Sequence, residues 1–286
     1  MKNPTELKLI DSIDSHYLFA SDFYEIKDWA FDFKDEEKVN EGYNDCFCIV
    51  FVKKGNFVID LSGKSHDMHT GHIIIEKADY EYKLRPATGA CTIFNFTKSF
   101  YHQLINDYQL GNSFFFSNSN LLSLLLKSSP EIDYLHHQIL KNIMGAGKLE
   151  IDSLVLSLVQ QITGCFTDKM FCHELPASLR RNHIPTIERA KAYINEKFVD
   201  DISLQELSDH CHTSSFHFCR TFKKFTSYTP HQYLLNIRLK HAEVLLRNTE
   251  LPVADICFSS GFNSLEHFAT AFKQRHKVSP TQYRRQ

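Results

Sequence analysis

The chain has 286 residues, a length that suits about two domains, and its 43% hydrophobic and 23% charged residues are typical of an ordinary globular protein. The N-terminus has no apolar run behind a basic start, and the aliphatic stretch Leu121–Leu126 is far too short to cross a bilayer, so we expect neither signal peptide nor membrane span. The eight cysteines are scattered, which fits reduced thiols in a cytoplasmic protein.

Charge is distributed unevenly along the chain. Residues 180–286 carry 16 Lys/Arg against 10 Asp/Glu, a net +6, so the net −2 of the whole chain leaves −8 for residues 1–179. Opposite charge on two segments indicates two modules with different partners, and the basic module is the candidate for binding a polyanion.

Residues 20–97 have the pattern of short β-strands. Runs at 46–52 and 72–77 are β-branched or aromatic, and stretches at 56–63 and 91–97 alternate apolar and polar residues. The predicted turns lie at 54–56, 62–64, 70–71 and 88–89. Turns about ten residues apart predict an antiparallel barrel or sandwich.

Helical spacing follows the strands. It occurs at residues 99–110, 118–127, 130–144 and 150–166. Residues 167–184 lose this periodicity and contain Pro176, so we expect an interdomain linker there. This gives three predicted parts, namely a domain at 1–166, the linker at 167–184 and a second domain at 185–286.

The sequence predicts helices throughout the second domain. A helix is expected from Pro185 with Thr186 as N-cap, and a short one at 204–210 begins with the capping-box pair Ser203 and Glu206. Further helices are expected at about 214–226, at 230–247, after Pro252, and in the last stretch of the chain.

A repeat runs through this helical domain. Residues 203–233 and 252–283 match at an offset of fifty, with a one-residue difference that falls in a turn. The recurring residues are Phe218, Phe222, Lys223, Pro230 and Tyr233, which return as Phe268, Phe272, Lys273, Pro280 and Tyr283. Each copy predicts a short helix, a tight turn and a longer helix, which is a helix-turn-helix whose second helix can enter a major groove.

The duplicated unit resembles the DNA-binding domain of the AraC/XylS family of transcription regulators over about residues 185–286. The resemblance is carried by the "FK" in each copy, by Ile256 with Gly261-Phe262, and by "SPTQYR" near the end. One departure is His212-Thr213 in the first copy, where the second has Gly-Phe. The resemblance implies a ligand-responsive regulator, most often an activator, that binds double-stranded DNA as a homodimer, with RNA polymerase as a further partner.

The candidate DNA-binding residues lie on the two second helices. In the first copy they are Ser215, Phe216, Cys219, Arg220, Lys223 and Lys224. In the second they are Asn263, Ser264, Leu265, Glu266, Thr270, Lys273 and Arg275. Arg220 is the first choice for reading guanine or clamping phosphate, whereas the shorter or acidic side chains of the second copy suggest phosphate contacts from Asn263, Ser264, Lys273 and Arg275. Glu266 either accepts a hydrogen bond from cytosine N4 or is an acidic residue that only interacts with the N-terminus of its own helix.

The first domain resembles, more weakly, the cupin-like sensor half of the same family. The fold expected is therefore α+β, with a cupin-like antiparallel barrel and following helices before the all-α double helix-turn-helix domain. A pocket between sheets is implied for an unidentified small-molecule effector. Its candidate residues are Phe47, His72, Tyr80, Tyr82, Arg85 and Phe94. Helix 150–166 is either a dimer seam or a helix packed on its own barrel.

Two alternatives concern the first domain. A cupin-type metal-dependent enzyme would need clustered ligands, but His66, His69 and His72 are spaced so that they do not share a strand face, and we expect no metal, no cofactor and no enzymatic activity. A thiol sensor is conceivable because Cys46 and Cys48 share a face, although buried cysteine as a small hydrophobe is commoner.

Overall fold

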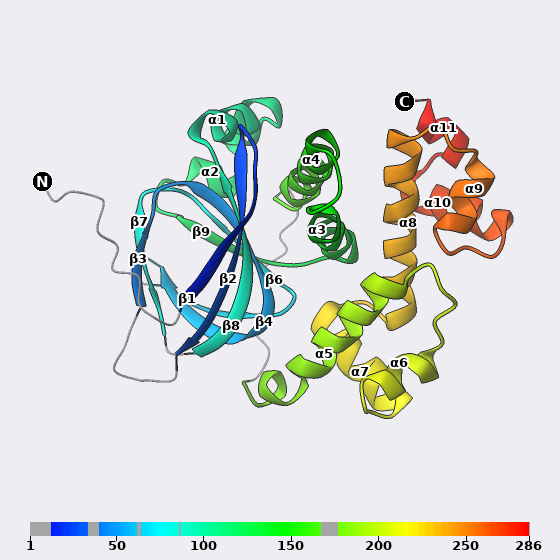
Figure 1. Cartoon of the computed structure of the whole chain (residues 1–286), viewed down its shortest axis with the longest axis horizontal. Coiled ribbons are helices and arrows are strands. Elements are labelled where there is room, and N and C mark those ends of the chain that lie inside the picture. The colour runs from blue at the N-terminus through cyan, green and yellow to red at the C-terminus, as the bar shows by residue number, and fades with distance from the viewer. Residues whose placement is uncertain (1–12, 34–39, 62–63, 86, 167–176, 286) are drawn as a thin grey trace, which may run out of the picture. The chain divides into compact units, whose positions relative to one another are not determined.

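The structure is a computed structural model, and it describes residues 13–33, 40–61, 64–85, 87–166 and 177–285 (Figure 1). The chain divides into two compact units. The first unit comprises Met1–Ser128 and Ile139–Glu188, and the second comprises Ser129–Gln138 and Arg189–Gln286. Ser129–Gln138 thus belongs to the same unit as the C-terminal helices, although it lies far from them in the sequence.

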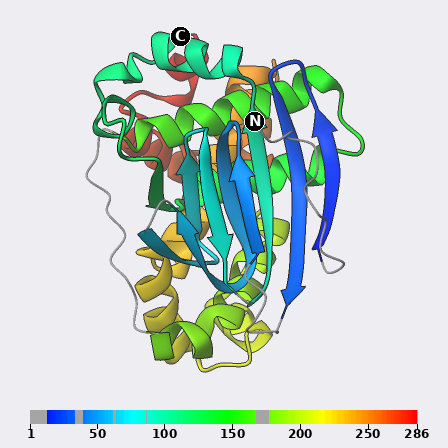
Figure 2. The ribbon, with the colours of Figure 1, turned by 90° about the vertical axis from the view of Figure 1, so that its left-hand side faces the viewer.

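The first unit is built on an antiparallel sheet, whose strands run side by side in Figure 2. Its strands are β1 (Ile13–Ala20), β2 (Tyr24–Phe33), β3 (Asn40–Asn44), β4 (Phe47–Leu61), β5 (Lys64–His69), β6 (His72–Glu76), β7 (Tyr80–Leu84), β8 (Ala87–Phe96) and β9 (Ser123–Lys127). The main path runs β1-β2-β8-β4-β6-β9, while β5 and β7 pair with β4, and β3 pairs with β7. No pairing joins β1 to β9 among the described strands, so the sheet is not closed and the predicted barrel is not confirmed.

Strand β4 organises this unit because both of its faces are covered. Cys48, Val50 and Val52 point into one apolar cluster that also contains Phe57 and Cys91. The alternate residues of β4, beginning with Phe47, are also buried but lie on the opposite face. A continuous apolar run of this kind is therefore what a strand covered on both sides requires.

Two predicted turns are wrong, since they lie inside strands. Residues 54–56 continue β4 and residues 88–89 lie in β8, where Gly55 pairs with Gly89. A Cβ on Gly55 would lie 2.4 Å from the carbonyl oxygen of Thr88, and its φ is +91°. These glycines therefore mark a bulge and a close approach of two strands. The predicted turn at 70–71 is confirmed, and residues 62–63 of another lie outside the described residues.

Helices complete the first unit. They are α1 (Lys98–Asp107), the short η1 (Leu110–Asn112) and α2 (Phe114–Ser117), the last four residues of α3 (Pro130–Asn142), α4 (Lys148–Gly164) and the first half of α5 (Ala177–Lys197). The helix predicted at 118–127 is wrong, because residues 123–127 form strand β9 beside β6. Helix α4 buries its apolar face, with Ile151, Leu154 and Leu158, inside this chain.

The predicted helices of the C-terminal region are confirmed with one shift. They are α6 (Leu204–His210), α7 (Ser215–Thr226), α8 (Pro230–Asn248), α9 (Val253–Ser259), α10 (Leu265–His276) and α11 (Pro280–Arg284). The predicted capping box of Ser203 and Glu206 is present. Helix α5, however, begins at Ala177 and contains Pro185, so residues 177–184 are helical where a linker and an N-cap at Thr186 were expected. Residues 167–176 of that linker lie outside the described residues.

Candidate nucleic-acid interface

The two predicted helix-turn-helix units agree in backbone detail. Helices α6 and α7 form the first, and α9 and α10 form the second. The side chain of Ser214 accepts a bond from the backbone N–H of His217 at 3.4 Å, and Ser264 accepts from His267 at 3.3 Å. Both second helices end at a left-handed residue, with φ of 72° at Ser227 and 67° at Lys277. The repeat in the sequence is therefore a repeat of caps and helix ends.

The turns between the paired helices also match. The N–H of Thr213 donates to the carbonyl of Ser208 at 3.0 Å, and the N–H of Phe262 donates to that of Cys257 at 3.2 Å. The residue before each donor has positive φ, which is 54° at His212 and 81° at Gly261. The departure seen in the sequence thus changes the residue type and leaves the turn itself in place.

The two cores are built from the same ring contacts. Phe218 and Phe222 have ring centroids 5.5 Å apart, and their counterparts Phe268 and Phe272 are 5.6 Å apart. Phe222 meets Tyr233 edge-on at 5.3 Å, while Phe272 meets Tyr283 at 5.4 Å. All four phenylalanines are fully buried. Because the core holds one side of each second helix, the opposite side is left for a ligand.

The outer face of α7 combines an aromatic ring with basic side chains. Phe216 is 81% exposed, and Arg220, Lys223 and Lys224 are exposed as well. Residues 216, 220 and 223 are spaced three or four apart, so they share one side of the helix. This side offers a guanidinium for bidentate contacts and a ring for a thymine methyl group.

The matching face of α10 is less basic. Leu265 is 45% exposed, and Glu266, Thr270 and Lys273 are exposed around it. Glu266 stands in the first turn of the helix, where a carboxylate interacts favourably with the helix dipole. A single lysine on this face suits a backbone contact better than a reader of several bases.

Three of the predicted contact residues also have partners inside the protein. Ser215 is half-buried and bonds to Ser208 at 2.8 Å and to Gln205 at 3.1 Å. Ser264 is the N-cap of α10, whereas its neighbour Asn263 is exposed. Arg275 lies about 180° around α10 from Glu266. Its guanidinium is 2.7 Å from a carboxylate oxygen of Glu131 in α3.

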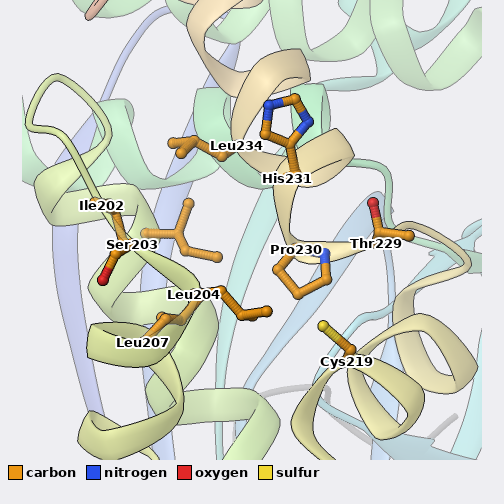
Figure 3. Close-up of a pocket in the computed structure, with 10 residues that line it drawn as sticks. Ile202, Ser203, Leu204, Leu207, Cys219, Thr229, Pro230, His231 and Leu234 are labelled. Carbon is orange, nitrogen blue, oxygen red and sulfur yellow. The ribbon is translucent and has the colours of Figure 1, made fainter. Parts of the chain in front are cut away.

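Cys219 lines a pocket beside the first helix-turn-helix, within the second unit (Figure 3). The pocket has a volume of about 180 Å³ and is mostly apolar, with Leu204, Leu207 and Leu234 facing Cys219 and Pro230 across it. In the second copy of the repeat, the residue matching Leu234 is Arg284, which donates to the carbonyl of Leu251 at 2.6 Å. The two copies therefore differ at this position.

The predicted effector residues lie at several places in the first unit. Tyr80 and Tyr82 pack in or against the apolar cluster of the sheet, whereas Phe47 and Phe94 are buried outside that cluster. Arg85 lies on the surface, where it makes two bonds of 2.9 Å to Asp60. The ring of His72 lies 3.7 Å from that of His69. Their role as ligand-binding residues stays a prediction.

A buried carboxyl that the sequence reading missed lies inside the first unit. Glu76 is 5% exposed, and the thiol of Cys48 donates to its Oε2 at 3.1 Å. Desolvation by burial raises the pKa of Glu76 despite hydrogen bonds from Tyr80 and Cys48. Desolvation also raises the pKa of Cys46 to about 11, which leaves little of that thiol in the reactive thiolate form. The apolar runs of β4 and β6 gave no sign of this pair in the sequence.

His241 in α8 makes the stability of the second unit depend on pH. Its Nδ1 lies 2.6 Å from the hydroxyl of Tyr134, and burial lowers its pKa from 6.5 to about 4. The unfolded chain therefore binds a proton that the folded chain excludes, so stability is full above about pH 6.5 and falls as the pH drops towards 4. We expect the free energy of unfolding of His241→Asn to fall by roughly 3 kcal/mol less over this pH range than that of the wild type. Urea unfolding of both chains at pH 7 and pH 4.5 measures it, and equal losses would contradict the assignment.

The second compact unit contains two helix-turn-helix motifs with matching caps and turns, and each has an exposed second helix. It is therefore a double helix-turn-helix DNA-binding domain. A family model described as a helix-turn-helix domain matches residues 207–286. The bifunctional transcriptional activator/DNA repair enzyme AdaA of Bacillus subtilis (strain 168) is 33% identical over 92 residues, 32% of this chain and 44% of AdaA. The transcriptional activator RhaS of Enterobacter sp. (strain 638) is 31% identical over 103 residues, 36% of this chain and 37% of RhaS.

Among solved structures, the C-terminal domain of AraT, a response regulator from Geobacillus stearothermophilus, is 34% identical with a TM-score of 0.35 and covers 35% of this chain and 84% of that one. The C-terminal unit is therefore similar to the DNA-binding parts of AraC-type transcription regulators, and the alternative of an enzyme receives no support. The chain spans less than half of the length of either curated relative.

The described residues hold no group of three or more His, Cys, Asp and Glu side chains that could bind a metal ion. No helix in the same residues is both long and apolar enough to cross a membrane.

Proposed function

We propose that this chain is a ligand-responsive transcription activator that inserts α7 and α10 into successive major grooves of one DNA duplex. The observation that carries the proposal is the close match between two units joined by α8, in the N-caps of their second helices, in the turns and in the ring contacts. Because the two copies share caps, turns and ring contacts, each exposes the same side of its second helix, and α8 joins the two copies. Helix α7 then reads bases through Phe216 and Arg220, while α10 contacts the backbone through Lys273.

The experiment begins with the full-length chain and a pool of random duplexes, from which selectively bound sequences are recovered. We expect Arg220→Ala to lower affinity for the selected duplex by about 1–3 kcal/mol and to relax the preference at one base position. Lys273→Ala is the matched comparison from the second copy. It should weaken all duplexes about equally and reduce the dependence of log K on log salt by about 1. A wild-type chain that recovers no preferred sequence would contradict the proposal.

The first unit is the proposed sensor, with a cupin-like arrangement at residues 1–166 and with 167–184 leading to the DNA-binding domain at 185–286. Its support is the covered sheet, in which the buried polar pair Glu76 and Cys48 lies beside an apolar cluster. A buried carboxyl is unfavourable unless it is paired, which makes Glu76 the polar group to test first. A thermal-shift screen against metabolites tests the sensor role, and Glu76→Gln should abolish the shift of any true effector.

Homodimerisation belongs to the same proposal. Its support is a set of large apolar side chains exposed on and beside α4, which are Met144, Leu149 and Leu156. Light scattering of the full-length chain tests it, and Leu149→Asp should shift a dimer towards the monomer. Contact with RNA polymerase and a cytoplasmic location are further parts of the proposal that follow from the family alone.

A further inference from the structure

Helix α3 supplies about two and a half turns of helix to the DNA-binding unit. Its first residues fall in the compact unit that contains the C-terminal helices, and its last four fall in the other. Glu131 is only 4% exposed, although it is a charged residue in the first turn of this helix. A carboxylate is rarely buried unless it is paired, so its partner indicates what the segment does.

The partner of Glu131 belongs to the second helix-turn-helix unit. Arg275 in α10 donates to Oε1 of Glu131 at 2.7 Å. Arg275 lies on the side of α10 that faces the protein, about opposite to Glu266. The contact therefore holds α10 from behind and leaves its outer face exposed.

Two residues further along α3, Asp133 contacts the first half of the domain. Its Oδ2 is 2.6 Å from the ammonium of Lys191 in α5 and accepts a bond from the hydroxyl of Tyr233 at 2.6 Å. Tyr233 lies in the first turn of α8, and its ring is the one that meets Phe222 of α7. Tyr233 therefore links Asp133 to the buried side of α7, since its hydroxyl bonds to Asp133 and its ring contacts Phe222.

The next residue, Tyr134, contacts the helix that joins the two units. Its hydroxyl lies 2.6 Å from Nδ1 of His241 in α8, and its ring meets Phe198 edge-on at 5.7 Å. Within four residues, α3 thus contacts α10, α5 and two places on α8. A contact set of this kind fixes several helices at once, because buried charged bonds require a defined geometry.

We propose that Glu131 and Asp133 are positioning residues for DNA recognition, which set the relative position of α7 and α10 so that both meet grooves of one duplex. The inference rests on the proposed binding of successive grooves. Recognition helices must match the helical repeat of DNA, about 34–36 Å along the axis, so a small change in their relative position weakens binding at a fixed half-site spacing. Arg275 then acts inside the protein, in place of the phosphate contact expected from the sequence.

The test uses the full-length chain and the duplex recovered by selection, together with a duplex that has one base pair inserted between the two half-sites and a duplex that holds one half-site alone. The variants are Glu131→Gln, Arg275→Gln and the double variant, with exposed Glu250→Gln as the matched control. We expect each single variant to bind the natural spacing about tenfold more weakly, and the double variant to bind no more weakly than either single one. The wild type should lose about tenfold on insertion, whereas the variants should lose much less.

Several results would overturn the positioning role. Unchanged affinity in the variants would show that the contact is irrelevant to DNA binding, and tighter binding would show that it is inhibitory. Equal weakening on all three duplexes would indicate damage to the fold, which thermal unfolding of each variant reports independently. A wild-type chain that selects no sequence would instead remove the proposed function, and this inference with it.

Discussion

Gly261→Ala is expected to destabilise the C-terminal unit by about 2–4 kcal/mol. Gly261 has a φ of +81°, a backbone conformation that is unfavourable for a residue with a Cβ. The added atom would also lie 2.8 Å from the carbonyl oxygen of Phe198 and 2.9 Å from Cα of Val199, and both of these are backbone atoms. Because backbone cannot rotate away as a side chain can, the connection between α5 and α6 would have to shift.

The first helix-turn-helix unit provides the matched comparison. His212 occupies the position of Gly261 with a φ of +54°, and it is exposed. We expect His212→Ala to destabilise by less than Gly261→Ala, and His212→Gly to stabilise by up to about 1 kcal/mol. The measurement is the urea midpoint of each full-length variant. A loss for Gly261→Ala no larger than the gain for His212→Gly would show that only backbone conformation matters and that the close approach at Gly261 does not.

The duplicated domain could be predicted well because its signals are local. Ser203 with Glu206, and prolines at the start of helices, specify where each helix begins, and the fifty-residue repeat gives two readings of the same motif. The sheet was harder. Leu121–Leu126 is apolar except for Ser123, a pattern that fits a helix as well as a strand, so only its pairing with β6 makes part of it a strand. Gly55 and Gly89 look like turn residues until the strands that they bring together are known.

The exposed candidates on α7 and α10 also followed from local periodicity, because Phe218 and Phe222 identify the buried side and leave Arg220 outside. The partner of Arg275 could not be found in this way. It is 144 residues away, in a helix that the sequence assigns to the other domain. No property of the α10 sequence distinguishes an arginine that binds phosphate from one that binds a distant carboxylate, since both patterns place a basic residue in the final turns of the helix.

Asp133→Leu is expected to have the largest effect of any single change in α3, destabilising the C-terminal unit by about 3–5 kcal/mol. The ammonium of Lys191 is 2.6 Å from Asp133, and Lys191 is only 8% exposed. Removing the carboxylate leaves this charge buried without its partner and takes from Tyr233 the acceptor at 2.6 Å. Circular dichroism during urea unfolding of the full-length chain measures the loss.

The double variant Asp133→Leu with Lys191→Met separates the charge from the packing. If the loss arises from the unpaired ammonium, the double variant should recover most of it, because a buried ion pair replaced by apolar side chains of similar volume is often neutral. The exposed pair of Lys197 and Asp200 in the same unit is the control, and Asp200→Asn should change the midpoint little. A double variant as unstable as Asp133→Leu alone would place the effect in the bond to Tyr233. A double variant that is stable but binds DNA with relaxed half-site spacing would show that this buried pair serves geometry more than stability.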